Sequence, residues 1–163
     1  MGIAKGESGI MVEKKVLVVC MGNICRSPTA EVVLRTKAKE QNIPVIVDSA
    51  GTQGYHRGER PDPRSQAAGE ARGYRFKGVK ARKVTDDDFS QFDLILAADR
   101  DNLRVLTALC PAEYQHKLGL FLQYGESLIE EIPDPYYGGQ RGFDHVLDLV
   151  EQAADGLLMH LSR

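Results

Sequence analysis

The sequence is poor in cysteine, has no long apolar run and carries no excess of positive charge. Its three cysteines, an odd and small number, do not form the disulfide framework that stabilises many small secreted domains. No apolar stretch approaches the roughly 20 residues of a membrane-spanning helix. The net charge of -2 excludes an overall basic footprint for nucleic acid. We therefore expect a reduced, cytoplasmic protein, with no nucleic-acid partner and no membrane insertion, whose affinity for any phosphate group is local.

The chain of 163 residues has the length of one ordinary domain, which can bury most of its unfolded surface without disulfides or metals. No internal repeat, low-complexity tract or linker divides it. Residues 1–14 contain charges and glycines but lack the apolar core of a signal peptide. We expect residues 1–14 to be a flexible N-terminal extension and residues 15–163 to form a single domain.

Apolar runs and helical patterns alternate along the chain. The first run is rich in β-branched residues and is typical of a strand buried on both faces of a parallel sheet. The four expected strands are residues 15–20, 45–47, 93–98 and 118–122. The expected helices begin at Ser27-Pro28 and cover residues 63–72, 102–109 and 143–161, with Ser27 and Asp99 as N-caps. This order predicts an α/β fold, a three-layer doubly wound sandwich with a four-stranded parallel sheet, whose ligands bind beyond the carboxyl ends of the strands.

The two longest irregular stretches are residues 51–62 and 132–142. Loops of this length in a compact domain are usually functional or disordered. Both contain aromatic residues, which disordered segments seldom favour, so we expect both loops to be functional. Three arginines in or just after the first loop, Arg57, Arg60 and Arg64, could form a basic rim that steers an anionic substrate.

The segment from Cys20 to Ser27 joins the first strand to the first helix. A phosphoryl group presents several anionic oxygens, and a short loop that enters a helix can surround it with backbone N–H donors. Gly22 and Asn23 are residue types that tolerate the unusual backbone dihedrals of such a loop. Arg26 presents a planar fork of donors matched to two phosphoryl oxygens. These features predict a phosphate-binding loop.

The same loop can activate a cysteine nucleophile. A helix N-terminus and a nearby cation stabilise a thiolate, so we expect Cys20 to be ionised at neutral pH and to attack phosphorus. The hydroxyl of Ser27 can donate a hydrogen bond to this sulfur. Taken singly, Cys20 could be a buried strand-end residue and Arg26 a surface residue. Their spacing between a strand and a helix start favours the catalytic interpretation.

Two other interpretations of this segment are weaker. No Gly-Lys-Ser/Thr follows Gly22, so the segment is not the nucleotide-binding P-loop. Cys20 and Cys25 lack the second pair of ligands that a zinc site needs. The four histidines show no ligand spacing, and we expect them on the surface or in packing positions. We expect neither a metal nor a cofactor.

The stretch from Val19 to Glu31 closely resembles the signature of low-molecular-weight protein tyrosine phosphatases. The resemblance runs from about Lys15 to the C-terminus. It includes four further stretches in the family's order: Asp48-Ser49-Ala50-Gly51-Thr52, Pro61-Asp62-Pro63-Arg64, Phe92-Asp93-Leu94-Ile95-Leu96 and Asp134-Pro135-Tyr136-Tyr137. It implies that residues 15–163 are a phosphatase domain that hydrolyses phosphotyrosine monoesters through a phosphocysteine intermediate, with Cys20 as nucleophile and Arg26 as phosphate clamp.

Expulsion of a tyrosyl leaving group, whose pKa is about 10, requires a proton donor at neutral pH. Asp134 is the candidate, and a proline on each side limits its movement. From the residues alone, an aspartate between prolines is more often a turn residue. The resemblance implies that Asp134 is the general acid and then the base for the water that hydrolyses the phosphoenzyme.

The resemblance also implies which residues contact the substrate. Tyr136 and Tyr137 would border the cleft, and Tyr55 in the other long loop would help to hold the phosphotyrosine ring by stacking. Half-buried packing is the alternative role of these three rings. The expected substrate-binding residues are Met21, Gly22, Asn23, Ile24, Cys25, Ser27, Tyr55, Tyr136 and Tyr137.

Two residues of the loop have further expected roles. Cys25 is close enough to Cys20 for a reversible disulfide that would protect the nucleophile, a redox role that the resemblance favours over simple burial. Asn23 is expected to order the loop by bonding to its own backbone or to Ser49. Cys110 has no partner in sequence and is expected in the core.

Three other activities stay open. Thioredoxin-coupled arsenate reductases share the loop but need two further redox cysteines close together, whereas Cys110 stands alone. Protein arginine phosphatases carry threonine where this chain has Ile24, which favours phosphotyrosine. A non-catalytic phosphate-binding module would not need Cys20, Arg26 and Asp134 together. The expected partners are a phosphotyrosine-containing protein substrate and a cognate tyrosine kinase.

Overall fold

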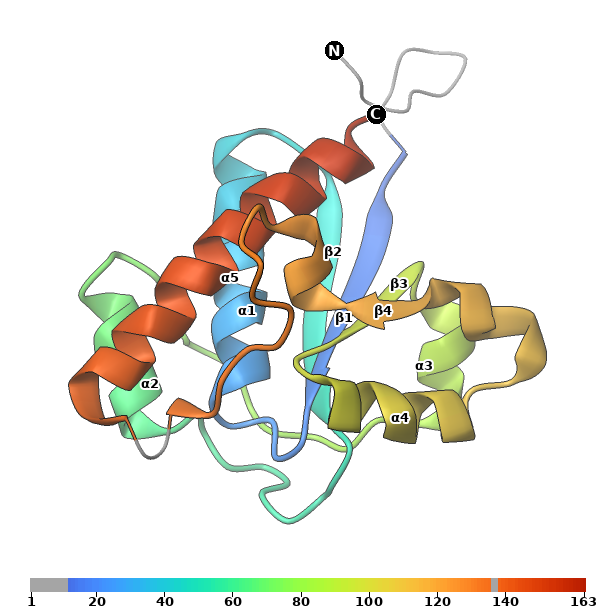
Figure 1. Ribbon diagram of the computed structural model, residues 1–163, viewed down its shortest axis with the longest axis horizontal. Coiled ribbons are helices and arrows are strands. Elements are labelled where there is room, and N and C mark those ends of the chain that lie inside the picture. Colours follow the sequence, from blue (N-terminus) through green and yellow to red (C-terminus); the bar gives the residue numbers. More distant parts are fainter. Residues whose placement is uncertain (1–11, 136–137) are drawn as a thin grey trace.

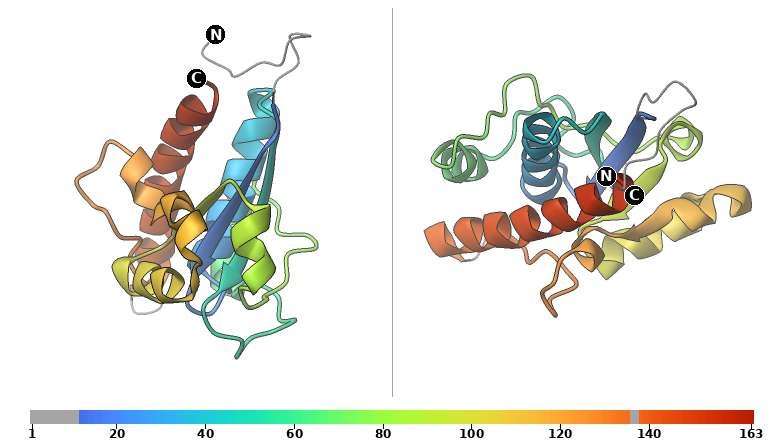
Figure 2. Two further views of the ribbon diagram at one scale, coloured as in Figure 1. Left: turned by 90° about the vertical axis from the view of Figure 1, so that its right-hand side faces the viewer. Right: turned by 90° about the horizontal axis from the view of Figure 1, so that it is seen from above.

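The computed structural model describes residues 12–135 and 138–163. A four-stranded parallel sheet with strand order β2-β1-β3-β4 forms its centre (Figure 1). The strands are β1 (Lys14–Cys20), β2 (Val45–Gly51), β3 (Leu94–Ala97) and β4 (Leu118–Leu120). Helices cover both faces of this sheet (Figure 2), so the predicted three-layer α/β fold is confirmed.

The outer layers consist of five α-helices and two short 3-10 helices within the described ranges. They are α1 (Arg26–Glu40), α2 (Pro63–Glu70), α3 (Asp86–Gln91), α4 (Arg100–Leu109), α5 (Gly139–Leu161), η1 (Ala112–Lys117) and η2 (Phe121–Tyr124). Helices α1, α2 and α5 contribute to the core on one face of the sheet. Helices α3 and α4 contribute to the core on the other face.

Strand β1 lies in the middle of the sheet and pairs in parallel with both β2 and β3. Val16 and Val18 enter one core, and Leu17 and Val19 enter the other, because successive side chains of a strand point to opposite faces. All four side chains are fully buried, which confirms the predicted two-sided burial of this strand. Lys14, the last residue of the expected extension, already belongs to β1, and residues 1–11 lie outside the described residues.

Strand β2 is longer than its apolar run predicts. It continues through Asp48 and Ser49, whose polar side chains are satisfied by neighbours. Arg82 donates to the carboxylate of Asp48, and the hydroxyl of Ser49 donates to Glu31. Strand β4 is shorter than predicted, because the chain turns into η2 at Phe121. Hydrogen-bonded polar residues therefore extend a strand that apolar patterning alone would end.

Helix α1 begins at Arg26, so the prediction that Ser27 caps it is wrong. Ser27 lies inside the first turn and is fully buried. Its hydroxyl accepts a hydrogen bond from Asn23 Nδ2 at 2.8 Å and lies 3.0 Å from the sulfur of Cys20. These partners take the hydroxyl away from the helix N–H groups that a capping side chain would bind. Cys25 occupies the N-cap position without a side-chain cap.

The carboxyl ends of β1 and β3 lead directly into α1 and α4. Asp99 caps α4 as predicted, because its Oδ1 accepts the N–H of Asn102 at 2.8 Å. The loop over residues 52–62 follows β2 at the same end of the sheet, at the bottom of Figure 1. This edge of the sheet therefore gathers the segments that the sequence marked as functional.

Helix α5 packs against α1 and η2 and confirms the helical period predicted for the C-terminal segment. Gly156 lies at the contact with η2, where a β-carbon on this residue would come within 1.8 Å of the backbone oxygen of Tyr124. Although α5 is long, neither it nor any other helix in the described ranges combines the length and apolarity needed to cross a membrane.

Substitution of Gly156 by alanine tests the contact between α5 and η2. Alanine gains about 1 kcal/mol of helix propensity over glycine. The overlap with a backbone carbonyl cannot be relieved by rotating a side chain, and overpacking of this kind destabilises by about 1–3 kcal/mol or more. We expect Gly156→Ala to lower the free energy of unfolding by about 2 kcal/mol in a urea titration. The exposed neighbour variant Gln152→Ala should change it by less than about 0.5 kcal/mol. An unchanged midpoint for Gly156→Ala would contradict this packing.

Candidate active site

Cys20 ends β1 and is 3% exposed at the base of the loop over residues 21–25. Two groups lie within hydrogen-bond distance of its sulfur. The backbone N–H of Asn23 points at Sγ with an N···S distance of 3.3 Å, and Ser27 Oγ lies 3.0 Å away. Both contacts come from residues that follow Cys20 closely in sequence, so the turn into α1 creates the environment of the sulfur.

Asn23 holds the loop in this shape. Its φ of 57° lies in the left-handed region, which few residues other than glycine adopt. Its buried side chain bonds three neighbours: Nδ2 donates to Ser27 Oγ at 2.8 Å and to Ser49 Oγ at 2.9 Å, and Oδ1 accepts the N–H of Arg82 at 3.0 Å. The predicted bond to Ser49 is confirmed. The side chain makes the other bonds to Ser27 and Arg82 instead of to its own backbone.

Beneath Asn23, the network continues to a buried carboxylate. Ser49 Oγ donates to Glu31 Oε1 at 2.5 Å, and Arg35 forms an ion pair with the same carboxylate. Burial raises the pKa of Glu31, while the contacts with Ser49 and Arg35 act in the opposite direction. A buried carboxyl group, held by Ser49 and Arg35, thus lies under the loop.

Arg26 is held by two segments that lie far away in the sequence. Its Nη1 donates to Asp99 Oδ2 at 2.7 Å and to the backbone oxygen of Ile132 at 2.9 Å. Burial opposes the charge, but Asp99 and the nearby Cys20 outweigh it, so the pKa of Arg26 is raised. Within the described residues, Nε and Nη2 of Arg26 make no hydrogen bond. These donors are therefore available to a ligand.

A pocket of about 400 Å³ opens above Cys20. Its wall combines the nucleophile loop, the loop after β2 and the segment before α5. The lining residues are Cys20, Met21, Gly22, Ile24, Cys25, Arg26, His56, Asp62 and Asp134. A sulfur, a guanidinium and two carboxylates therefore face one cavity at the carboxyl end of the sheet.

Asp134 reaches this pocket from a segment that is anchored by the residues just before it. The N–H of Ile132 donates to the backbone oxygen of Ala98 at 2.8 Å, and Ile132 is buried. One residue earlier, the carboxylate of Glu131 accepts the backbone N–H of Arg100 at 2.8 Å. The side chain of Asp134 itself is exposed. The first turn of α4 thus fixes the approach of the aspartate.

Comparison with known proteins assigns this arrangement to a family. The family model described as low molecular weight phosphotyrosine protein phosphatase matches residues 15–163. The chain belongs to the low molecular weight phosphotyrosine protein phosphatase family. The resemblance that the loop from Cys20 to Ser27 suggested is confirmed, and it extends over the whole described sheet.

Relatives from distant organisms match most of the chain. A low molecular weight protein-tyrosine-phosphatase of Streptomyces coelicolor is 42% identical, over 88% of this chain and 91% of its own length. A human low molecular weight phosphotyrosine protein phosphatase is 43% identical, over 82% of this chain and 86% of its own. The crystal structure of a protein tyrosine phosphatase from Entamoeba histolytica superposes with a TM-score of 0.87 at 40% identity, covering 91% of this chain and 96% of that chain.

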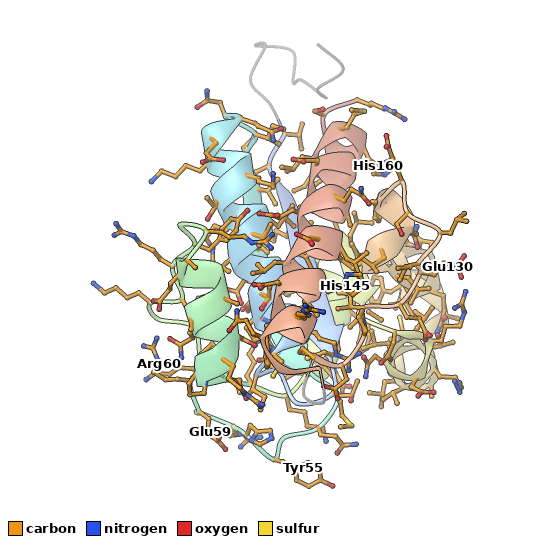
Figure 3. All side chains as sticks on the ribbon, turned by 60° about the vertical axis from the view of Figure 1, so that its left-hand side comes forward. Tyr55, Glu59, Arg60, Glu130, His145 and His160 are labelled. Carbon is orange, nitrogen blue, oxygen red and sulfur yellow. The ribbon has the colours of Figure 1, made fainter. Side chains whose placement is uncertain are left out.

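The pocket brings together most of the residues expected at the site, but not all. The side chains of Asn23 and Ser27 are buried beneath the loop backbone instead of lining the cavity. Tyr55 is 81% exposed and lies at the tip of its loop (Figure 3), outside the cavity lining. Tyr136 and Tyr137 lie outside the described residues. The stacking roles of the three tyrosines stay predictions.

Three residues of the site carry roles that the sequence did not reveal. His56 lines the pocket beside Gly22, where a β-carbon would come within 3.1 Å of the His56 ring, whereas we expected a surface or packing histidine. Asp62 lines the pocket and also caps α2. Asp99 was recognised as a helix cap but not as the partner of Arg26. The long loop after β2 was the signal for His56, and Asp62 also belonged to the family-like stretch Pro61-Asp62-Pro63-Arg64, which assigned it no role.

Substitution of Asn23 by alanine tests the loop network. Asn23→Ala removes three side-chain hydrogen bonds and leaves alanine with a positive φ. Because displacement of reacting groups by about 1 Å can reduce rates about 100-fold, we expect kcat/KM for p-nitrophenyl phosphate to fall about 10- to 100-fold. The matched control is Asn42→Ala, since Asn42 also has a positive φ, of 56°, but is exposed beyond the end of α1. The control should leave kcat/KM unchanged. Equal effects of the two variants would contradict a specific role of Asn23.

Proposed function

We propose that this protein hydrolyses phosphotyrosine in proteins by covalent catalysis, with Cys20 as nucleophile, Arg26 as phosphate clamp and Asp134 as general acid and base. The observation that carries the proposal is the pocket itself, in which these three side chains face one cavity. The family membership supports the same assignment.

In the first step, the Cys20 thiolate attacks phosphorus, an S–P bond forms and the bond between phosphorus and the tyrosyl oxygen breaks. Protonated Asp134 gives its proton to that oxygen, so the leaving group departs as neutral tyrosine. Free donors of Arg26 and the loop amides bind the phosphoryl oxygens as charge develops on them. The product of this step is phosphocysteine at residue 20 and an ionised aspartate.

In the second step, the Asp134 carboxylate accepts a proton from water, whose oxygen attacks the phosphorus of phosphocysteine. The S–P bond breaks, inorganic phosphate is released and the thiolate is regenerated. Ser27 Oγ lies 3.0 Å from this sulfur and accepts from Asn23, so its own hydrogen is available to the sulfur, which is closer than the other acceptor, the Ala50 backbone oxygen at 3.5 Å. A hydrogen bond to the departing thiolate makes it a better leaving group.

The arrangement argues against an arsenate reductase that relays electrons through further cysteines. Cys110 is buried in the core on the far side of the sheet, with Leu17 and Phe89, and is not part of the pocket lining. A relay would require it to exchange with the Cys20 sulfur. Ile24 lines the cavity with an apolar side chain, which suits an aromatic substrate.

The proposed chemistry also bears on location and partners. Cys20 acts only as a reduced thiolate, which suits a reducing compartment such as the cytoplasm. Phosphotyrosine in proteins is made by tyrosine kinases, so a kinase that acts on the same substrates is the enzyme class that must precede this reaction. We therefore propose a cytoplasmic enzyme that opposes a tyrosine kinase.

Hydrolysis of p-nitrophenyl phosphate and phenyl phosphate tests the assignment of roles. We expect Cys20→Ser to lose at least about 1,000-fold in kcat, because the nucleophile is removed. Asp134→Ala should lose about 100-fold or more with phenyl phosphate, whose leaving group needs a proton, and less with p-nitrophenyl phosphate. Cys110→Ser and Asp87→Ala are matched controls away from the pocket and should retain their rates. An inert wild type, or a Cys20→Ser variant with full activity, would refute the mechanism.

We further propose that Cys25 protects Cys20 from irreversible oxidation. A peroxide converts the Cys20 thiolate to sulfenic acid, and the Cys25 sulfur then attacks it, forming a disulfide and releasing water. Both cysteines are free thiols and both line the pocket. Burial raises the pKa of the Cys25 thiol to about 11, with a hydrogen bond to Ser65 acting against it and the charge of Asp62 adding to it.

This raised pKa predicts how protection depends on pH. Because the pKa of Cys25 is raised to about 11, little of its thiolate exists at neutral pH, and disulfide formation should accelerate about tenfold per pH unit as the solution becomes alkaline. After peroxide treatment, dithiothreitol should restore activity to the wild type and to the Cys110→Ser control but not to Cys25→Ser. Full recovery of activity by Cys25→Ser after dithiothreitol treatment would contradict the protective role of Cys25.

A further inference from the structure

Positive charge is concentrated in one stretch of an otherwise acidic chain. Residues 51–83 contain nine lysines and arginines but three acidic residues, whereas the whole chain has a net charge of -2. The remaining residues are therefore net negative. This stretch begins in the loop that lines the pocket and ends at the strand edge beside it.

Six cations of this stretch are exposed and form no salt bridge with the described residues. They are Arg57, Arg60, Arg75, Lys77, Lys80 and Lys83, which we call the basic surface. Within residues 12–135 and 138–163, no carboxylate lies within salt-bridge distance of any of the six. The other three arginines of the stretch are neutralised by acidic partners: Arg64 by Asp62, Arg72 by Asp148 and Glu151, and Arg82 by Asp48 and Asp88.

The basic surface adjoins the mouth of the pocket. The loop that supplies His56 to the pocket wall is bonded to the segment around Ala81: the N–H of Gly58 donates to Ala81 O at 2.8 Å, and the N–H of Ala81 donates to Glu59 O at 2.9 Å. Arg57 and Lys80 therefore flank the same pair of backbone contacts. In Figure 3, Tyr55, Glu59 and Arg60 follow one another along this loop toward α2.

Nearby carboxylates reduce this charge only in part. The loop contains two acidic residues: the carboxylate of Glu59 is bonded to His56 at 3.1 Å, and that of Asp62 pairs with Arg64. Asp86 lines a shallow hollow together with Lys83 at one end of the basic surface. Arg60 is oriented by neutral partners, since it donates to Gln66 and to the backbone oxygen of Phe76. The middle of the surface thus keeps an uncompensated positive charge.

We propose that the basic surface binds acidic residues that flank the phosphotyrosine of a protein substrate, an inference that rests on the proposed function. A phosphotyrosine in the pocket brings its neighbours across the rim formed by residues 56–59. An extended peptide covers about 3.3 Å per residue, so flanking positions within about five residues can reach the exposed cations. Opposite charges across such an interface accelerate association and discriminate among partners.

The charge distribution favours a short acidic segment over a large polyanion. A nucleic acid or an anionic membrane would extend beyond the basic surface onto the rest of the chain, which is net negative. A flanking segment of a few residues needs only the area beside the pocket. Binding of the phosphotyrosine in the pocket also holds the flanking acidic segment beside the basic surface, which raises the effective concentration of that segment there.

Two phosphotyrosine peptides test the proposal: they carry glutamate or glutamine at three positions on each side and are otherwise identical. We expect the wild type to prefer the acidic peptide about tenfold in kcat/KM at about 20 mM ionic strength, and about twofold at about 0.5 M, where screening shortens the reach of charge. The variant Arg57→Gln/Lys80→Gln/Lys83→Gln should lose this preference. The control Lys14→Gln/Lys39→Gln/Arg163→Gln removes the same charge elsewhere and should retain it. Hydrolysis of p-nitrophenyl phosphate should be unchanged in both.

Three results would overturn the proposal: equal kcat/KM for the two peptides, equal loss of preference in the control, or adsorption of the wild type to phosphatidylserine vesicles that requires the three cations while the peptides are hydrolysed equally. Failure of the proposed function gives a different result, namely no wild-type hydrolysis of p-nitrophenyl phosphate. In that case, the affinities of Cys20→Ser for the two peptides still decide the inference: tighter binding of the acidic peptide supports it and equal binding refutes it.

Discussion

The left-handed backbone at Asn23 is the constraint on which the rest of the site depends. A residue other than glycine costs about 1–2 kcal/mol in that conformation, and Asn23 is also almost fully buried. Its side chain compensates by bonding Ser27, Ser49 and the backbone of Arg82. Glycine would accept the dihedral angle but could supply none of these bonds. The turn that points the N–H of Asn23 at the Cys20 sulfur therefore requires a residue that both tolerates positive φ and fills a polar cavity.

A second junction connects the loop over residues 21–25 to Asp134. Asp99 accepts an N–H of α4 through one oxygen and a hydrogen bond from Arg26 through the other, so one carboxylate orients both a helix and the guanidinium of Arg26. Arg26 also holds the backbone of Ile132, two residues before Asp134. Displacement of any of these groups would shift both the guanidinium and the aspartate. The two halves of the proposed mechanism, more than a hundred residues apart in sequence, are thus fixed relative to each other.

The sequence was sufficient for the parts of the structure that local patterns determine. The two-sided burial of β1, the order of strands and helices, and the cap at Asp99 all follow from short stretches of residues, and the structure has them. The start of α1 did not follow, because the hydroxyl of Ser27 bonds Asn23 and lies against the sulfur of Cys20 in the preceding loop instead of capping the helix. The end of β2 depends on Arg82 in the same way.

Residues in irregular segments were harder to assign than residues next to strands. Cys20 and Arg26 flank a strand end and a helix start, so their positions could be inferred from the topology rule for parallel sheets. His56 reaches the pocket only because the loop after β2 folds back against Gly22 and is bonded to Ala81, contacts that no periodicity encodes. The basic surface could not be assigned from the sequence for the same reason. Only the salt bridges of the folded protein distinguish the six exposed cations from the three arginines that carboxylates neutralise.

The carboxylate of Glu31 determines which groups donate and which accept in the buried hydrogen-bond network. Because the pKa of Glu31 is raised by burial, its ionised form subtracts from stability once the pH rises through that pKa, so stability alone does not account for a carboxylate there. An ionised carboxylate can only accept hydrogen bonds, so Ser49 must donate to it and must therefore accept from Asn23. Asn23 then donates to Ser27 as well, so the hydrogen of Ser27 can go to the sulfur of Cys20 at 3.0 Å or to the more distant backbone oxygen of Ala50 at 3.5 Å. An amide or hydroxyl in place of the carboxylate could donate as readily as accept. The direction of each hydrogen bond from Ser49 to Ser27 would then no longer be fixed.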